Sequence, residues 1–532
     1  MSSHRVAPRR RWNSTWVVLL LAGCTAGQDS AVPGAPADMG KADVTPAVFE
    51  GPVPRAVCGA NSLPETDIQG RVSIDDRSSG RSQQGYRCNL ELVGQYQGQG
   101  TTWVSQSYKN CAYHSQTFPT SLQGPSPGVQ VVDVSDPKHP VLAGTLTSPA
   151  FLGNTWESLK VNEARGLLAG VQVGIGEGAV FFDVYDIGTD CLHPKLLNSV
   201  GPTQLSIPAD SIGHEGNWSP DGNTYWSTSL AGGIVTAIDV SDPALPRALF
   251  VGNAGIVNHG FELSADGNRL YLANVAPEGL DILDVSEIQS RKLAPQMHKL
   301  GSVTWTDGST GQHSIPVSWN GKPYLVFVDE GGNGAARIID ISDETAPVVV
   351  SKLKLEIHMP EYAEQRTADL AGNGSFGYEG HYCTVDRREN PTAIACGYFQ
   401  SGVRVFDVRD PMNPHEIAYY NPPAQVGKSA QLTGSEHANG LLQVYAPANL
   451  TADWCSSPPR FVEQADGERQ LWVTCQDNGF MVLKFTNGSY PVADVAPVVT
   501  PVVSAPSTGR YGAALAWSLL LPLFAAALRR RR

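Results

Sequence analysis

The sequence predicts an all-β protein folded as a seven-bladed β-propeller. The first observation is a repeated phrase, Asp-Val-Ser-Asp-Pro or a close variant, which mostly follows an apolar stretch. Its copies begin at Asp133, Asp239, Asp284, Asp340 and Asp407. The later copies are about 45 to 67 residues apart, nearer the period of propeller blades than that of helical repeats. The second observation is the composition, because 54 glycines and 38 prolines with few helix-periodic stretches favour a turn-rich β protein.

One complete blade can be followed between residues 212 and 251. Its four strands are expected at residues 214–219, 224–229, 234–240 and 247–251. The Asp221-Gly222 pair between the first two strands is a hairpin turn signal. The repeated phrase follows the third strand, where its aspartate and serine cap a turn and its proline sets the next bend. The phrase is therefore interpreted as structural rather than as a set of calcium ligands.

The same pattern yields seven third strands along the chain. They are expected at residues 129–134, 180–184, 234–240, 280–285, 337–341, 403–408 and 480–485. The first complete blade is expected to begin near Gln84, whereas the last copy stops after its third strand. We therefore expect residues 67–73 to form an outer strand that completes blade seven, since closing the ring removes open sheet edges.

The repeated phrase and the blade count resemble the bacterial LVIVD-repeat proteins, a family of seven-bladed propellers. The resemblance covers roughly residues 65–486; it implies the fold and little about activity. In design, the chain also distantly resembles the selenium-binding and methanethiol oxidase propellers, in which channel histidines hold copper. No motif of that second family matches here, so no residue role is carried over from it.

The first 23 residues have the layout of a secretory signal peptide. Arg9–Arg11 precede an apolar run at residues 16–22, as in exported proteins. Leu21-Ala22-Gly23-Cys24 resembles a bacterial lipobox, which implies cleavage before Cys24 and attachment of lipid to it. An ordinary signal peptide with an unrelated cysteine is the alternative. Residues 24–56, rich in Ala, Pro, Gly and Asp, are expected to be a flexible tether.

The propeller is expected to span residues 57–490, followed by a Pro-rich linker at 491–510 and a C-terminal helix at 511–532. The uncharged residues 512–528 are just long enough to cross a membrane, and the four terminal arginines favour the cytoplasmic side. The pattern also resembles bacterial sorting signals that a protease removes, and both interpretations stay open. In either case we expect a membrane-anchored propeller outside the cytoplasm, in the periplasm or at the cell surface.

The cysteine count agrees with an oxidising compartment. There are nine cysteines, and lipidation of Cys24 leaves an even number for disulfides. The expected pairs are Cys88–Cys111, Cys383–Cys396 and Cys455–Cys475, because each flanks or occupies analogous strands of one blade. Cys58 and Cys191 are left to each other by elimination only.

Charge and motifs exclude several function classes. The formal net charge of −13 argues against a nucleic-acid partner, which needs a concentrated basic face. There is no Gly-x-Ser-x-Gly elbow of an α/β-hydrolase and no phosphate-binding P-loop.

Four histidines occupy equivalent places in consecutive blades. His214, His259 and His313 each lie eight residues before the glycine of a hairpin turn, and His381 holds the corresponding place in blade six. Equal offsets put these side chains at one height on the innermost strands, where they can share a transition metal such as copper, zinc or iron. Glu157 holds the matching position in blade two and would be a further ligand or a general base. The alternative is a solvated ring that duplication has copied.

Two long loops mark one face of the propeller as a recognition surface. Residues 360–377 and 422–457 precede the innermost strands of blades six and seven, and long loops on a rigid scaffold commonly bind ligands. The first functional expectation is a monomeric scaffold that binds a protein, a glycan or a small ligand at this face. The second is a metal-dependent, copper-type oxidoreductase with a histidine-lined channel.

Overall fold

The computed structural model describes most of the chain between Val48 and Tyr490. Within this range, residues 99, 102, 116–127, 153–154, 156, 173–180, 199–204, 207–212, 230–231, 371–375 and 426–451 are not described. The expected signal peptide, Cys24, the Pro-rich linker and the C-terminal helix also lie outside the described residues. Among the residues that are described, no helix is long and apolar enough to cross a membrane.

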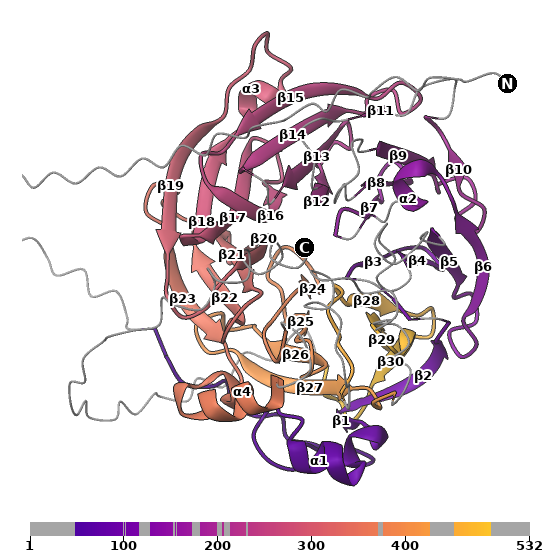
Figure 1. Cartoon of the computed structure of the whole chain (residues 1–532), viewed down its shortest axis with the longest axis vertical. Helices are drawn as coiled ribbons and strands as arrows, with labels where there is room; N and C mark the ends of the chain where they lie inside the picture. The colour runs from indigo at the N-terminus through magenta and orange to yellow at the C-terminus, as the bar shows by residue number, and fades with distance from the viewer. Residues whose placement is uncertain are drawn as a thin grey trace, which may run out of the picture. The chain divides into compact units, whose positions relative to one another are not determined.

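The described strands form seven antiparallel sheets arranged in a ring (Figure 1). We call the centre of this ring, which the innermost strands face, the channel. Blade one consists of β3 (Ser105–Tyr108), β4 (Cys111–Ser115), β5 (Val129–Asp133) and β6 (Val141–Leu146). Blade two consists of β7 (Lys160–Asn162), β8 (Leu167–Val171), β9 (Phe181–Asp186) and β10 (Lys195–Leu196), with β11 (Leu205–Ser206) also paired to β9. Blade three consists of β12 (Gly213–Trp218), β13 (Thr224–Ser229), β14 (Ile234–Asp239) and β15 (Arg247–Asn253).

The remaining blades follow the same order from the innermost to the outermost strand. Blade four consists of β16 (Val257–Leu263), β17 (Arg269–Ala276), β18 (Glu278–Asp284) and β19 (His298–Thr304). Blade five consists of β20 (Gly311–Trp319), β21 (Lys322–Asp329), β22 (Ala336–Asp340) and β23 (Val348–Leu353). Blade six consists of β24 (Cys383–Val385), β25 (Ala393–Gly397), β26 (Val403–Asp407) and β27 (His415–Asn421). Blade seven consists of β28 (Arg460–Glu463), β29 (Arg469–Cys475), β30 (Gly479–Phe485) and β2 (Leu90–Tyr96).

The all-β, seven-bladed prediction is therefore confirmed, and the seven expected third strands correspond to the third strand of each blade. Asp133 shows why the repeated phrase recurs: its Oδ1 accepts a hydrogen bond from the backbone N–H of Ser135 at 2.8 Å. Asp239 and Ser241 repeat this contact at 3.0 Å. The phrase caps the end of the third strand, which confirms its structural interpretation.

The ring is closed by a different segment from the one expected. The strand β2 pairs antiparallel with β30, with Leu90 opposite Phe485 and Tyr96 opposite Phe480. Residues 67–73 instead form a turn, with Gly70 at φ 89°, and Ser73 caps the following helix by accepting a hydrogen bond from Asp76 N–H. Local turn and capping chemistry thus prevails over strand formation there.

The start of blade one also needs correction. The expected first strand near Gln84 is β1 (Tyr86–Cys88), which pairs with β27 as an added outer strand of blade six. Blade one begins at β3 instead. The N-terminal segment therefore passes the outer edges of blades six and seven before it enters the ring.

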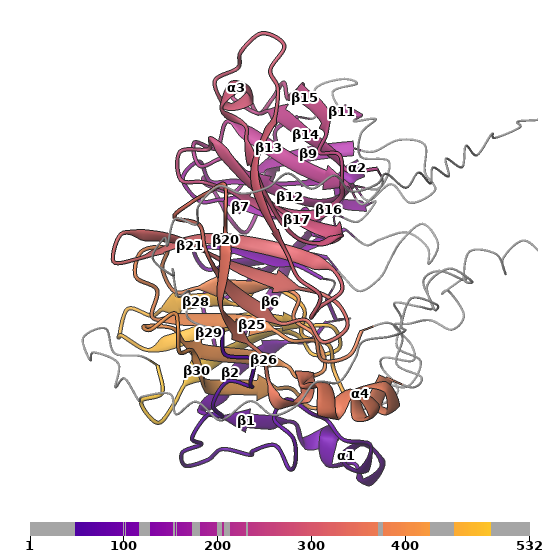
Figure 2. The same ribbon diagram turned by 90° about the vertical axis from the view of Figure 1, so that its left-hand side faces the viewer.

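Short helices lie at several places around the ring (Figure 1). They are α1 (Ile74–Ser79), η1 (Arg81–Gln84), α2 (Pro149–Leu152), α3 (Ser286–Gln289), η3 (Glu356–His358), η4 (Pro360–Tyr362) and α4 (Ala363–Leu370). Figures 1 and 2 both show α1 and α4 on one side of the molecule. Arg71 joins the two segments through a 2.8 Å ion pair with Asp369.

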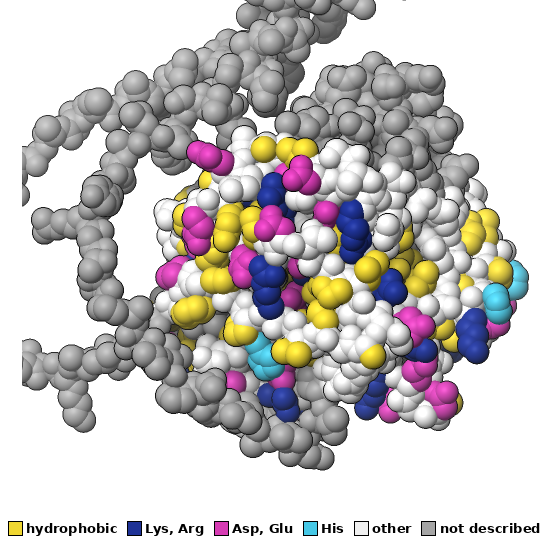
Figure 3. Space-filling view, turned by 90° about the horizontal axis from the view of Figure 1, so that it is seen from below, with side chains coloured by type: hydrophobic (Ala, Val, Ile, Leu, Met, Phe, Trp, Pro, Cys, Tyr) yellow, Lys and Arg dark blue, Asp and Glu magenta, His cyan; other side chains and the backbone are white. Residues whose placement is uncertain are grey.

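The hydrophobic core lies between neighbouring blades. The second and third strands are buried along almost their whole length, as in β13 and β25, because a sheet lies against each of their faces. Val326 and Ile338 of blade five, for example, pack in one cluster with Ile394 and Phe406 of blade six. The outer strands are more exposed. On the face shown in Figure 3, acidic, basic and hydrophobic side chains are interspersed, and no concentrated basic surface is seen there.

Four disulfides join the eight described cysteines, and two of the expected pairs are confirmed. These are Cys383–Cys396 and Cys455–Cys475. The other pairs are Cys58–Cys88 and Cys111–Cys191, so the expected Cys88–Cys111 and Cys58–Cys191 pairs are wrong. The physical reason is the misassigned blade: Cys88 lies on β1 in blade six, whereas Cys111 lies on β4 in blade one.

Candidate metal centre in the channel

The innermost strands place three of the four predicted histidines around one carboxylate. His214 lies on β12, His259 lies on β16, and His381 comes two residues before β24. Glu157 precedes β7 and is held there by an isolated parallel bridge to Glu215. These side chains are withdrawn from solvent: His381 is 0 % exposed, and Glu157 and His259 are each 2 % exposed. Four blades therefore contribute to one buried cluster.

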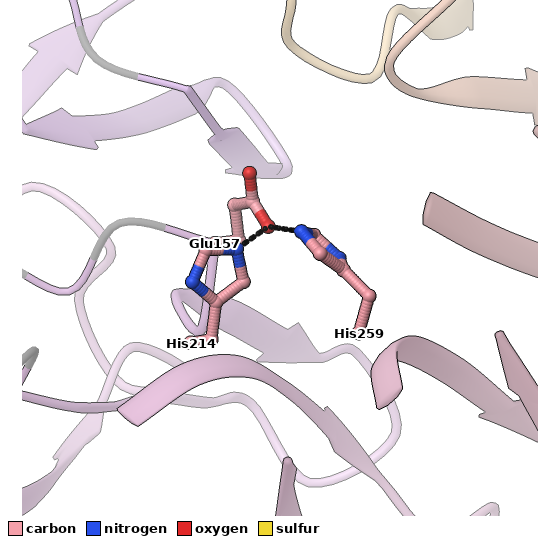
Figure 4. Close-up of side chains that lie close together, drawn as sticks. All are labelled: Glu157, His214 and His259. Carbon is pink, nitrogen blue, oxygen red and sulfur yellow. Dashed lines mark ion pairs between the residues drawn. The ribbon is translucent and has the colours of Figure 1, made fainter. Parts of the chain in front are cut away.

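The first group of donors contains two imidazoles and one carboxylate. The Oε2 atom of Glu157 lies 3.0 Å from Nε2 of His214 and 3.8 Å from Nε2 of His259. Figure 4 shows this carboxylate oxygen between the two rings. The ring centroids of His214 and His259 are 4.2 Å apart. One ligand atom from each residue falls within 4.8 Å of the others, as a shared metal ion requires.

The second group shares Glu157 but uses its other oxygen. Oε1 of Glu157 lies 2.9 Å from Nε2 of His381. Glu330 completes this group, with its Oε1 at 3.4 Å from the same nitrogen. The other oxygen of Glu330, Oε2, lies 3.3 Å from Nε2 of His259. The cluster thus contains three imidazoles and two carboxylates, which we call the channel cluster: Glu157, His214, His259, Glu330 and His381.

The fourth predicted histidine lies in a neighbouring pair instead. Nδ1 of His313 is 2.9 Å from Oε1 of Glu215, and Nζ of Lys160 is 3.4 Å from the same oxygen. The expectation that all four imidazoles converge is therefore corrected. The register shift in β20 precedes His313, between Gly311 and His313, whereas the shifts in β12 and β16 span His214 and His259. Equal offsets from the hairpin glycine therefore do not give the same side-chain direction in all three strands.

Two carboxylates of this region were not identified from the sequence. Glu215 directly follows His214, and alternation along β12 would have pointed it away from the channel had a register shift not intervened. Glu330 directly follows β21, and its N–H donates to Thr310 O at 2.7 Å. The hairpin turn at Asn320 could have revealed Glu330 in the sequence. Because β20 and β21 pair antiparallel, the end of β21 lies beside the start of β20.

The electrostatics of the channel cluster favour charged carboxylates. Burial opposes ionisation of Glu157, but the imidazoles of His214, His259 and His381 outweigh it and hold the pKa of Glu157 well below its usual range. Burial likewise opposes ionisation of Glu330, and hydrogen bonds from His259 and His381 lower the pKa of Glu330 to about 2. In return, the charges of Glu157 and Glu330 outweigh burial and raise the pKa of His259 and of His381, the latter to about 10. Without an ion these two imidazoles therefore hold protons, which a metal bound to the same nitrogens would displace.

Contacts with residues outside the cluster hold the ring of His381 in the orientation of a metal ligand. Its Nδ1–H donates to the carbonyl oxygen of Ser456 at 2.8 Å, which directs Nε2 towards the two carboxylates. This arrangement is the usual support of a metal-bound histidine. Trp103, Phe399 and Tyr382 surround the ring, with centroids 5.5, 5.1 and 4.8 Å away. The aromatic surroundings limit access of water to this side of the cluster.

One oxygen of Glu157 is buried without a hydrogen-bond partner among the described residues. Within the described part of the chain, Oε2 of Glu157 is buried and accepts no hydrogen bond, although two imidazoles lie beside it. A buried carboxylate oxygen without a donor is costly. A metal ion between Glu157, His214 and His259 would satisfy it, so the donor set and its geometry fit a transition metal.

A separate cavity lies among the innermost strands of four blades. Its volume is about 390 Å³, and residues of the innermost strands β3, β7, β24 and β28 line it. Gln106, Glu163, Asp386 and Arg460 contribute its polar groups. Cavities of this size accommodate small ligands.

Comparisons with known proteins bear on the fold. The model of the LVIVD repeat matches residues 127–148, which contain β5 and the first copy of the repeated phrase. No curated protein matches the chain. A solved structure of a Lactobacillus plantarum protein is similar at 12% identity, covering 60% of this chain and 87% of that chain, with a TM-score of 0.40.

Two further similar structures are proposed 6-phosphogluconolactonases. The protein from Bacteroides uniformis is 12% identical, covers 70% of this chain and 95% of its own, and has a TM-score of 0.44. The protein from Bacteroides fragilis is 12% identical, covers 69% of this chain and 92% of its own, and has a TM-score of 0.43. None of these three similarities carries an argument about the activity of this chain.

Proposed function

We propose that this chain, an LVIVD-repeat β-propeller protein, is an extracytoplasmic metalloprotein that carries out oxidoreductase chemistry in its channel. The observation that carries the proposal is the Glu157 carboxylate, which faces imidazoles from three blades at 2.9 to 3.8 Å. Glu157, His214 and His259 form a set of two histidines and one carboxylate, the donor set of many redox-active iron sites with open coordination positions.

The donors also indicate which metals fit. The channel cluster offers imidazole nitrogens and carboxylate oxygens but no thiolate, since the eight described cysteines are in disulfides. Imidazole suits iron, copper and zinc, and carboxylate adds manganese, whereas thiolate-preferring ions are disfavoured. When bound, a redox-active ion of this class supplies one-electron chemistry and open positions for a small ligand.

The surrounding side chains prepare the site for such an ion. His381 is held by Ser456 O with Nε2 towards the carboxylates. Lys160 and His313 both lie against Glu215, and their interactions with this carboxylate together outweigh its burial and lower the pKa of Glu215. Gly260 leaves room for that carboxylate, because a Cβ there would lie 1.8 Å from Oε2 of Glu215.

Four disulfides indicate an extracellular or periplasmic location for the propeller. Lipid attachment at Cys24 and a C-terminal anchor at residues 511–532 remain part of the proposal. They would hold the propeller at a membrane surface, outside the cytoplasm.

Binding of a protein, glycan or small ligand at the loop face is the competing proposal. Of the two long loops, residues 360–370 fold as η4 and α4, and most of residues 422–457 lie outside the described chain. The described contacts therefore support the channel more strongly than the loop face.

Metal content tests the proposed function. Untagged full-length protein, exported to an oxidising compartment, would be compared with His214→Ala and with His139→Ala, a control whose side chain is 78% exposed. We expect at least one equivalent of iron, copper or manganese in the wild type and in His139→Ala, and less metal in His214→Ala; zinc alone would contradict the oxidoreductase part of the proposal. A wild type that contains no metal and binds none on titration would overturn the proposal and favour a binding role for the loop face.

A further inference from the structure

We infer that the channel cluster binds two divalent transition-metal ions, bridged by the carboxylates of Glu157 and Glu330. This inference rests on the proposed function, because it adds a second ion to the same site. It follows from the way in which the two carboxylates divide their oxygens between the histidines.

Glu157 faces different imidazoles with its two oxygens. Its Oε2 is 3.0 Å from Nε2 of His214, whereas its Oε1 is 2.9 Å from Nε2 of His381. The carboxylate therefore separates His214 and His259 on one side from His381 on the other. These are the positions of terminal ligands on the two ions of a carboxylate-bridged pair.

Glu330 divides its oxygens between the same two sides. Its Oε2 is 3.3 Å from Nε2 of His259, and its Oε1 is 3.4 Å from Nε2 of His381. Two carboxylates thus span one pair of positions in parallel. A single bridging carboxylate could arise from an ordinary ion pair, but two that connect the same imidazoles define two adjacent binding positions.

One ion would use this donor set incompletely. Metal bonds to nitrogen and oxygen are about 2.0–2.2 Å long. An ion bound to Oε2 of Glu157 beside His214 and His259 therefore leaves Oε1 of Glu157 and Nε2 of His381 without a metal. An ion beside His381 would instead leave His214, His259 and Oε2 of Glu157 without a metal. Ions in known two-metal sites lie about 3.5–4 Å apart, a spacing that bridging carboxylates provide.

Gln312 offers an additional donor on the His381 side. Its side-chain nitrogen is 3.2 Å from Nε2 of His381, and its Oε1 is buried without a hydrogen-bond partner among the described residues. The two ends of an amide are assigned from their contacts. Turning this amide would direct the oxygen to the second ion, beside His381 and the Oε1 atoms of both carboxylates.

Counting Co(II) ions tests the inference. Full-length protein would be freed of metal with a chelator and titrated with Co(II) alone, and bound metal would be counted by equilibrium dialysis and followed by electron paramagnetic resonance. We expect two ions per chain, and the signal of the first ion should weaken as the second binds because bridging carboxylates couple their spins. His381→Ala should bind one uncoupled ion, and the exposed control Glu361→Gln should bind two.

The outcomes separate the two proposals. One ion per chain in the wild type would overturn the second site and leave the proposed metalloprotein intact, whereas no bound ion would overturn both. Should His381→Ala fail to fold by circular dichroism, His381→Gln provides the same test with a hydrogen-bonding side chain. Two ions that persist in every folded His381 variant would also contradict the assignment.

Discussion

Oε2 of Glu157 lies 3.0 Å from Nε2 of His214, although the two residues belong to neighbouring blades. The contact depends on the pairing of Glu157 with Glu215 across the boundary between blades two and three. The candidate site is therefore assembled from several blades, and among the described residues each group that could hold a metal draws on more than one blade. Changes that disturb how blades meet should disturb the site as well.

His313→Ala should keep the full metal content, whereas His259→Ala should contain less metal. His313 contacts Glu215 rather than Glu157, and Lys160 still faces that carboxylate after the substitution. His259 lies beside both Glu157 and Glu330. Metal per chain in the purified proteins is the measurement. Equal loss in two folded variants would restore His313 as a ligand.

Gly260→Ala should reduce both metal content and thermal stability. The new Cβ would lie 1.8 Å from Oε2 of Glu215 and 2.2 Å from the backbone oxygen of Gln312, and a backbone oxygen cannot move aside as a side chain can. Gly144→Ala is the matched control, because no atom lies within 4 Å of its new Cβ. Melting curves and metal analysis of the two variants would show whether this close approach matters.

Removing Cys111–Cys191 should destabilise the protein more than removing Cys383–Cys396. The first disulfide closes a separation of 80 residues and the second one of 13. Loop-closure entropy then predicts that the free energy of unfolding falls by about 4.5 kcal/mol without the first disulfide and by about 3 kcal/mol without the second. Urea unfolding of the two double Cys→Ala variants measures both free energies. In a separate experiment, peptide mapping of the unreduced protein should recover Cys58 joined to Cys88. Equal losses would argue against the entropic account.

Leu92→Pro should weaken the whole ring, whereas Leu142→Pro should have a smaller effect. Both residues lie next to a bulge in the outer strand of a blade, Leu92 in β2 and Leu142 in β6. Proline in a strand removes a backbone donor from the hydrogen-bond ladder, but of these two strands only β2 joins the two ends of the ring. Urea unfolding and light scattering would detect the difference, and identical unfolding midpoints would count against closure by β2.

His358 should make the protein less stable as the pH falls below 6.5. Burial lowers the pKa of His358 to about 3, and its Nδ1 accepts a hydrogen bond from Leu355 N–H at 2.9 Å. Since an unfolded histidine has a pKa near 6.5, the unfolded chain binds the proton first. Stability contributed by the neutral ring is complete above pH 6.5 and declines towards pH 3, by about 1.4 kcal/mol per pH unit.

The non-titrating variant His358→Asn tests this dependence. It should be less stable at pH 7, but its stability should fall less steeply between pH 6 and pH 4.5. His139→Ala, a change at an exposed histidine, should follow the wild type. Chemical unfolding at several pH values gives the slopes, and parallel slopes for wild type and His358→Asn would show that His358 does not contribute.

Much of the fold was predictable because its signals are local. The third strand of blade three was expected at residues 234–240 and is observed at Ile234–Asp239. The Asp221-Gly222 turn and the capping contact of Asp239 with Ser241 act over a few residues, so they can be recognised in the sequence. The equal offsets of His214 and His259 from their turns likewise place both side chains on innermost strands.

The sequence by itself thus determined the repeat, the seven third strands, the two disulfides within blades and three histidines of the channel cluster. Only the tertiary structure decided that β2 closes the ring, that Cys88 pairs with Cys58, that His313 faces Glu215 and that Glu330 joins Glu157. The physical reason is how far apart in the sequence the interacting residues lie. Turns and strands follow from neighbouring residues, whereas ring closure, bulge geometry and the meeting of side chains from five blades depend on contacts between residues far apart in the chain.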